Sequence, residues 1–131
     1  MDPGAQPLGK KILIAEDETA ILDGIAEKFS LAGFDVKKAK NGEEGLAQAL
    51  ADRPDLILLD YRMPIMDGFT MLEKLREDVW GKNARVIFWS NSHGQEVQER
   101  ARKLGVIDIL TKSDWEFKDV VKRVKEKLGV A

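Results

Sequence analysis

The segment Asp55–Gly68 reads DLILLDYRMPIMDG and sets the interpretation of the whole chain. Its first part, Asp55–Leu59, is an almost continuous apolar run of strand length, which is typical of a strand buried on both faces of a parallel sheet. The run ends at the carboxylate of Asp60, and Tyr61–Asp67, which contains Pro64, predicts a loop. A buried strand that ends in an acid indicates an α/β protein with a polar site at that edge of the sheet.

Outward from this segment, strands and amphipathic helices alternate. The other predicted strands are Lys11–Ala15, Phe34–Lys38, Arg85–Trp89 and Val106–Leu110. Apolar residues at helical spacing predict helices around Ile21–Phe29, Leu46–Leu50, Met71–Val79, Gln95–Leu104 and Phe117–Leu128. Asn41 is a candidate cap for the second helix, and Ser113 with Glu116 resembles a capping box before the last one. Five strands alternating with five helices favour a flavodoxin-like parallel sheet, order 2-1-3-4-5, with helices on both faces.

Composition narrows the class of protein. The chain has 131 residues, of which 44% are hydrophobic and 34% charged, as expected for one globular domain. A net charge of -2 gives no sign of a nucleic-acid surface. Cysteine is absent, which excludes thiolate metal sites and fits a cytoplasmic location. Residues 1–10 are expected to form a flexible leader, and residues 11–131 the domain, with no apolar run long enough for a membrane span.

Polar residues follow the predicted strands at their carboxyl ends. They are Glu16 and Asp17, Asp60, Ser90 and Asn91, and Thr111 and Lys112. Three carboxylates in one place repel each other unless a cation intervenes, and Mg²⁺ (or Mn²⁺) prefers such oxygen ligands. Lys112 can pair with Asp60 or with a phosphate oxygen, and the Ser90 hydroxyl can donate to phosphate. A carboxylate such as Asp60 can attack phosphorus to form an aspartyl phosphate.

These motifs resemble the receiver domain of two-component response regulators, and the resemblance covers about Lys11 to Leu128. It implies that a histidine kinase or phosphotransfer protein phosphorylates Asp60 in a phosphorelay. It also implies that Mg²⁺ is held by Glu16, Asp17, Asp60 and the backbone carbonyl of Arg62, while Ser90, Asn91 and Lys112 surround the phosphoryl group. The chain would catalyse only its own phosphotransfer and dephosphorylation. A shifted conformational equilibrium would then control binding of a downstream protein target, without membrane or direct nucleic-acid binding.

The chain departs from the family pattern at several positions. Ile109 stands where an aromatic residue is usual, and Asn91 follows the switch hydroxyl where Ala or Gly is common. Ser113 replaces the usual proline after Lys112, and Arg62 could lean over the site. Since isoleucine is stiff at χ1 and smaller than tyrosine, we expect the signal to be read mainly through Ser90 and the loop Asn91–Gly94. Amide exchange with and without beryllofluoride, a phosphoryl mimic, would test this.

Three alternatives stay open at this stage. One is a protein-binding module of the same fold that works without phosphorylation. Another is a haloacid-dehalogenase-like phosphohydrolase, but Arg62 occupies the position of its second aspartate. A flavin carrier would need a phosphate-cradling loop where Glu16, Asp17 and Glu18 would repel phosphate. The sequence also leaves open whether the domain acts alone or with an output domain.

Overall fold

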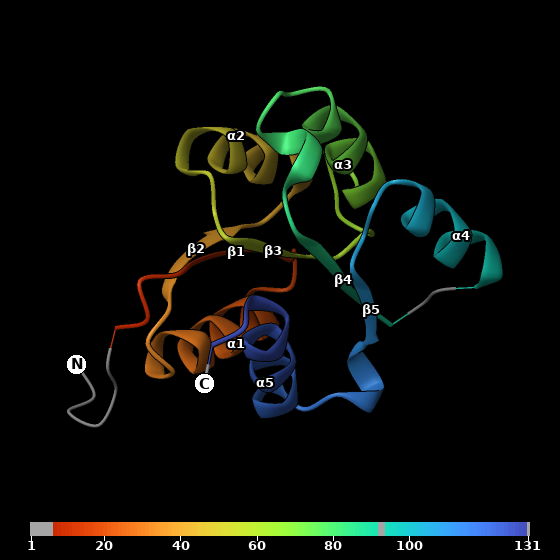
Figure 1. Ribbon diagram of the computed structural model, residues 1–131. Helices are drawn as coiled ribbons and strands as arrows, with labels where there is room; N and C mark the ends of the chain where they lie inside the picture. The colour runs from red at the N-terminus through yellow and green to blue at the C-terminus, as the bar shows by residue number, and fades with distance from the viewer. Residues whose placement is uncertain (1–6, 92–93, 131) are drawn as a thin grey trace.

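In the computed structural model, which describes residues 7–91 and 94–130, five short strands pair into one parallel sheet (Figure 1). They are β1 (Lys11–Ala15), β2 (Asp35–Ala39), β3 (Leu56–Leu59), β4 (Val86–Ser90) and β5 (Asp108–Thr111). Their spatial order, β2-β1-β3-β4-β5, confirms the predicted topology. β3 and β4 are buried along their whole length, whereas the edge strand β2 is largely exposed, as its polar sequence predicts.

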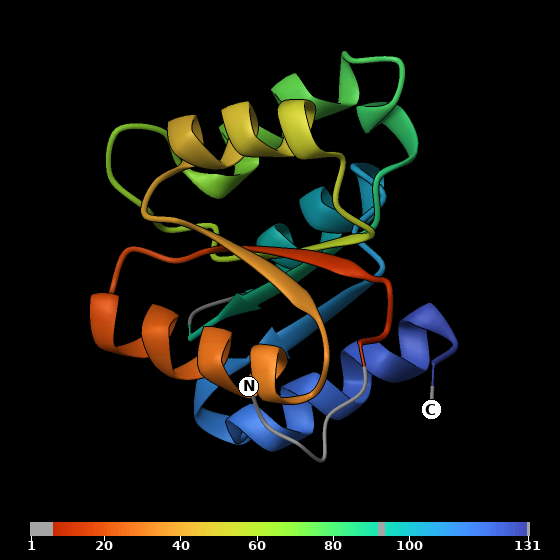
Figure 2. The same ribbon diagram turned by 90° about the vertical axis from the view of Figure 1, so that its left-hand side faces the viewer.

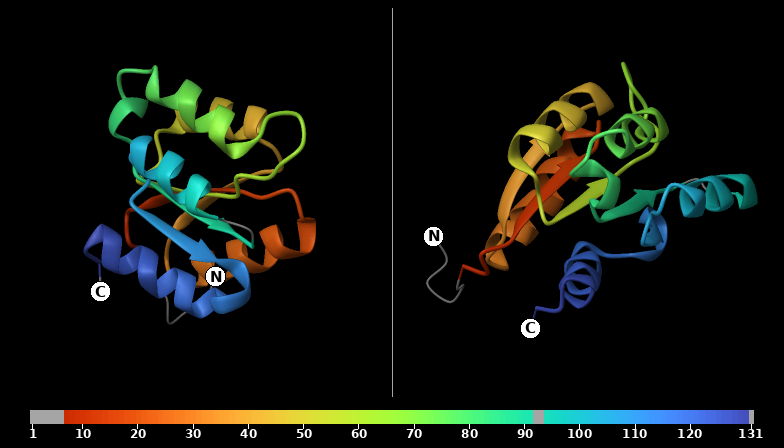
Figure 3. Two further views of the ribbon diagram at one scale, coloured as in Figure 1. Left: turned by 90° about the vertical axis from the view of Figure 1, so that its right-hand side faces the viewer. Right: turned by 45° about the horizontal axis from the view of Figure 1, so that its top comes forward.

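Helices cover both faces of this sheet. They are α1 (Thr19–Leu31), α2 (Gly42–Asp52), α3 (Gly68–Arg76), α4 (Gln95–Lys103) and α5 (Phe117–Leu128), with short 3₁₀ turns at Gly81–Asn83 and Lys112–Asp114. α1 and α5 lie on one face, and α2 and α3 on the other (Figure 2). α4 lies on the same face as α3, beside β4 and β5 (Figure 3). Within the described residues, no helix is long and apolar enough to cross a membrane.

Strand alternation assigns each core residue to one of these two faces. In β1, Ile12 and Ile14 pack toward α1 and α5, while Leu13 and Ala15 pack toward α2 and α3. Burial of each large aliphatic side chain stabilises the fold by about 1.5–3 kcal/mol. A shift of one residue in strand register would exchange the two sets, so these apolar residues hold the register of the sheet.

Local signals explain where several helices begin and end. The Asn41 side chain accepts a hydrogen bond from the backbone N–H of Glu44 at 2.8 Å, which confirms the predicted cap of α2. Gly105 follows α4 with φ of 77°, a left-handed conformation that glycine adopts without steric cost. In the leader, the Leu8 N–H donates to the Gly33 carbonyl at 3.0 Å, while residues 1–6 lie outside the described residues.

Two local predictions are wrong. The apolar spacing predicts that the third helix continues to an inward-facing Val79, but α3 ends at Arg76 and Val79 is 91% exposed. A competing turn ends the helix, since the Gly81 N–H donates to the Asp78 carboxylate at 2.9 Å. The capping box of α5 is formed by Glu116 and Asp119, one turn later than the predicted Ser113–Glu116 pair.

The loop after β3 is closed by two close backbone contacts. The Gly68 N–H donates to the Tyr61 carbonyl at 2.9 Å, and the Gly42 N–H donates to the Met66 carbonyl at 2.8 Å. A Cβ atom on Gly68 would lie 2.5 Å from the Cα of Tyr61 and 2.6 Å from the carbonyl oxygen of Asp60. The absence of a side chain at Gly68 therefore lets the chain fold back directly beneath Asp60.

We predict that Gly68→Ser lowers the free energy of unfolding by about 2 kcal/mol, because the backbone around Asp60 must move to admit the side chain. Urea unfolding measures the change. Gly94→Ser is the matched control, since a Cβ there meets no atom within 4 Å and serine is a good helix cap. Equal stability of the two variants would contradict the close approach at Gly68.

Candidate functional site

Strand register brings the predicted site residues to one edge of the sheet. Ala15 of β1 pairs with Leu59 of β3, so the residues that follow, Glu16 and Asp60, leave the sheet side by side. The Asp60 N–H donates to the Ala15 carbonyl at 3.0 Å and fixes this arrangement. Two strands away, Thr111 is the last residue of β5 and leads directly into Lys112.

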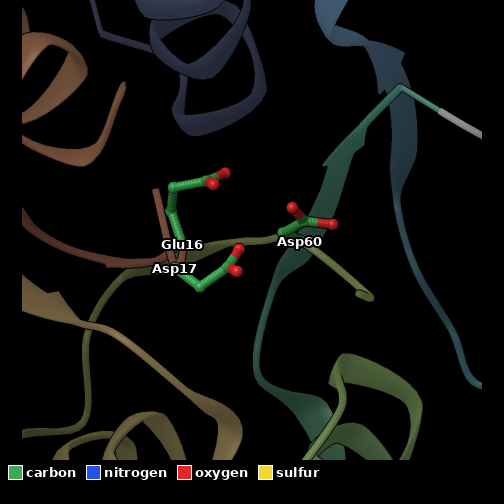
Figure 4. Close-up of side chains that lie close together, drawn as sticks. All are labelled: Glu16, Asp17 and Asp60. Atoms are coloured by element: carbon green, nitrogen blue, oxygen red, sulfur yellow. The ribbon is translucent and has the colours of Figure 1, made fainter. Parts of the chain in front are cut away.

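Three carboxylates gather at this edge (Figure 4). One oxygen from each of Glu16, Asp17 and Asp60 lies within 4.8 Å of the other two. Glu16 is fully buried and Asp60 is 6% exposed, whereas Asp17 faces solvent. Like charges this close, two of them buried, destabilise the folded protein unless a cation or a proton compensates them.

Lys112 provides the compensating charge within the protein. Its Nζ lies 2.9 Å from Asp60 Oδ2 and forms an ion pair with Glu16 Oε2. The Lys112 side chain is only 7% exposed, so both pairs are shielded from water. Among the described residues, Glu16 Oε2 nevertheless has no hydrogen bond of regular geometry. The cluster has three acids and one lysine, and therefore keeps an excess of negative charge.

The shifts in pKa follow from this burial and pairing. Burial raises the pKa of Glu16 above its ordinary 4.5, although the Lys112 ammonium acts in the opposite direction. Burial alone would lower the pKa of Lys112, but the carboxylates of Glu16 and Asp60 outweigh it and raise the pKa above 10.5. Lys112 therefore stays protonated at neutral pH.

The second oxygen of Asp60 is held by the backbone. The Arg62 N–H donates to Asp60 Oδ1 at 3.0 Å. The Arg62 guanidinium lies over the ring of Tyr61, 5.8 Å from its centroid, rather than over Asp60. Asp60 is thus held at both oxygens, by Lys112 and by its own loop.

The remaining predicted residues lie around this cluster. Ser90 is buried at the end of β4, and Asn91 follows it on the surface. Ser92 and His93 lie outside the described residues, so the expected role of loop Asn91–Gly94 stays a prediction. Ile109 is half-buried and lines a groove of about 630 Å³ between α4 and β5.

The sequence interpretation missed one partner of Lys112. It paired Lys112 with Asp60 or with a phosphate oxygen, but Glu16 is a second partner. Strand alternation indicates this pair. Ile14, Leu58 and Leu110 pack on the α1/α5 face of the sheet. The residues two positions later, Glu16, Asp60 and Lys112, are therefore expected toward that same face.

The acidic cluster fits a hard divalent cation. Carboxylate oxygens from two strand ends converge within ligand distance, and the exposed Asp17 leaves one side open to water. Mg²⁺ is held in this way, by a few carboxylates together with several waters. Within the described residues Asp17 has no ion pair or hydrogen bond, so its carboxylate is available as a ligand.

We predict that Lys112→Met lowers the free energy of unfolding by roughly 3–5 kcal/mol in metal-free buffer, because Glu16 and Asp60 lose their buried counter-charge. Adding Glu16→Gln should restore part of this loss by removing one carboxylate.

Stability should also depend on pH. In the unmodified protein the raised pKa of Lys112 contributes to the free energy of unfolding below pH 10.5, and this contribution is lost as the pH rises through the pKa of the folded state.

Urea unfolding at neutral and alkaline pH measures both effects. Lys38→Met is the control, since Lys38 pairs with Asp23 at 3.0 Å on the surface and should change stability by less than about 1 kcal/mol. A Lys112→Met protein as stable as this control would show that the buried cluster needs no ammonium.

Comparison with known proteins agrees with this geometry. Residues 12–125 match the family described as the response regulator receiver domain. A DNA-binding dual master transcriptional regulator, RpaA of Synechocystis, is 35% identical over 117 residues, covering 88% of this chain and 47% of the relative. Sporulation initiation phosphotransferase F of Bacillus subtilis is 31% identical over 118 residues, covering 88% of this chain and 94% of that protein. The chain thus spans under half of one relative and nearly all of the other.

Solved structures show the same fold. A CheY-like receiver domain protein of Methanospirillum hungatei is 29% identical with a TM-score of 0.84, covering 92% of this chain and 94% of that one. CheY in a CheX-CheY-BeF3-Mg complex of Borrelia burgdorferi is 27% identical with a TM-score of 0.81, covering 91% and 89%. The family match covers most of the chain, and the acid and lysine positions lie together at one edge of the sheet. This chain belongs to the response regulator receiver domain family.

Proposed function

We propose that this receiver domain is switched by phosphorylation of Asp60. The observation that carries the proposal is the position of the Asp60 carboxylate, held by the Lys112 ammonium at 2.9 Å and beside two further acids at the end of a buried strand. A carboxylate fixed in this way is a nucleophile with positive charge ready beside it. No comparable observation favours the haloacid-dehalogenase or flavin alternatives.

The donor is the phosphohistidine of a histidine kinase or of a phosphotransfer protein. An oxygen of Asp60 attacks phosphorus, the P–N bond to the histidine breaks, and the ring nitrogen leaves with its bonding electrons and takes up a proton. The product is an acyl phosphate on Asp60 and a free histidine. Lys112 would then pair with a phosphoryl oxygen, and the buried Ser90 hydroxyl, which ends the neighbouring strand, would donate to another.

Asp17 and Asp60 are the residues that would hold a divalent cation, with Glu16 acting directly or through water and the Arg62 carbonyl completing the set. When bound, Mg²⁺ would neutralise charge on the transferring phosphoryl group. Glu16 is the weaker candidate for direct ligation, because it is buried against Lys112. The relative from Borrelia, described with both BeF3 and Mg²⁺, supports this choice of ion.

A downstream protein would bind the phosphorylated and unphosphorylated domains with different affinities. The groove beside Ile109 lies between α4 and β5, and its lining includes Gln95, the first residue of α4. Movement of the Asn91–Gly94 loop on phosphorylation would carry α4 and alter the groove. The kinase and the target are proteins, and we propose that this domain acts in the cytoplasm without binding membrane or nucleic acid itself.

We predict that incubation with acetyl phosphate and Mg²⁺ adds one phosphoryl group, and that Asp60→Asn abolishes the addition because an amide is not a nucleophile toward phosphorus. Intact mass spectrometry measures it. Asp35→Asn, an exposed position at the opposite end of the sheet, is the control and should be labelled like the unmodified protein. A correctly folded, unmodified chain that takes up no phosphoryl group would favour the phosphorylation-independent binding module.

We also predict that EDTA stops the reaction and that Asp17→Asn slows it more than Glu16→Gln does. The physical reason is that Asp17 has no side-chain partner within residues 7–91 and 94–130, while Glu16 is already paired with Lys112. Rates of labelling at saturating Mg²⁺ compare the variants, and heat stability with and without Mg²⁺ gives an independent measure of ion binding. Full activity in excess EDTA would refute the metal requirement, whereas equal losses from both variants would refute only the ranking.

A further inference from the structure

Trp89 is a buried aromatic residue that contacts the site lysine. It precedes Ser90 in β4, belongs to the α1/α5 face and is only 2% exposed. Lys112 Nζ lies over its ring, 5.3 Å from the centroid. The negative face of an indole attracts an ammonium within about 6 Å. The charge of Lys112 therefore has three favourable neighbours, which are Glu16, Asp60 and Trp89.

The indole ring is supported from behind. Phe117, the first residue of α5, meets Trp89 edge to face, with centroids 5.9 Å apart and planes at 69°. Gly24 of α1 leaves room for this ring, since a Cβ there would lie 2.6 Å from Phe117 Cε2. Any larger residue at position 24 would displace the Phe117 ring. Helices α1 and α5 thus fix the indole beneath Lys112.

The orientation of the indole is not set by its own hydrogen bond. Trp89 Nε1 is buried and has no hydrogen-bond partner among the described residues. A buried tryptophan usually satisfies this N–H, and leaving it unpaired costs free energy. The ring is held instead by packing in the apolar core, by Phe117 and by the ammonium of Lys112.

We infer that Trp89 is a positioning residue that holds the Lys112 ammonium between Asp60 and Glu16. Lysine has a flexible four-carbon stem, so its ammonium is poorly fixed without support. A ring face attracts the charge but is a weak acceptor, so the three N–H groups remain available for carboxylate and phosphoryl oxygens. The consequence for phosphoryl binding rests on the proposed function, whereas the contact itself does not.

The contact can be tested without metal or phosphate. In NMR spectra of the apo protein, the Lys112 Hε protons should lie upfield of those of exposed lysines because of the indole ring current. Trp89→Leu should return them to the ordinary position. Phe29→Leu is the matched control, since Phe29 is a fully buried aromatic of the same core that pairs edge to face with Phe34 instead. An unshifted Lys112 in the unmodified protein would overturn the inference.

The positioning role is tested by the affinity for beryllofluoride with Mg²⁺, measured by calorimetry. Trp89→Leu should bind about tenfold more weakly, the size expected for loss of a shielded cation–π contact. Trp89→Phe keeps a ring face and should stay within about threefold, and Phe29→Leu should bind like the unmodified protein. If Trp89→Leu does not unfold cooperatively in urea, Trp89→Met replaces it as the non-aromatic variant.

Two results would overturn the positioning role. One is unchanged affinity in the non-aromatic variant, and the other is an equal loss in Phe29→Leu, which would mean that core stability alone sets the affinity. Failure of the proposed function gives a different pattern. The unmodified protein would then show the ring-current shift but bind no beryllofluoride, which supports the Lys112–Trp89 contact and rejects the phosphoryl site.

Discussion

The ion cluster of Lys112 with Glu16 and Asp60 joins residues that follow three different strands, β5, β1 and β3. Neighbouring strands lie about 4.8 Å apart, so a residue that follows β5 must cross β4 to reach Asp60 at the end of β3. Only a long side chain can do so, and the residue of β4 that it crosses is Trp89. Register, strand order and the length of lysine therefore determine together which charges meet.

Much of this arrangement could be predicted from the sequence. The apolar runs of β1, β3 and β4 identify buried strands, and their alternation with helices leaves few topologies, so the meeting of Glu16, Asp17, Asp60 and Lys112 follows from strand order. The predictions failed where short-range hydrogen bonds compete with periodicity. Val79 continues a helical spacing, but the Asp78–Gly81 turn ends the helix before it.

It was harder to predict which acid forms an ion pair with Lys112 than to predict which residues gather in the cluster. Which acid takes the lysine depends on burial: Glu16 continues the inward alternation of β1 and is buried, whereas Asp17 turns out to solvent. Strand alternation separates the two acids, since only Glu16 continues the face of Ile12 and Ile14. Their different surroundings explain why one can serve as the internal counter-charge of Lys112 while the other keeps a carboxylate free for an ion from solvent.

Aromatic side chains lie on both faces of the sheet, but those that reach the site lysine lie on the α1/α5 face. Ile109, on the α4 side of β5, has no ring, while Trp89 and Phe117 pack on the α1/α5 side and reach Lys112. Contacts thus run without a break from Asp60 through Lys112 and Trp89 to the start of α5. Continuity alone is not energetic coupling. Asp60 and α5 are energetically coupled only if Lys112 moves on the indole ring when the charge on Asp60 changes. Closely packed aromatic rings respond to such a displaced neighbour by repacking and not by small elastic adjustments.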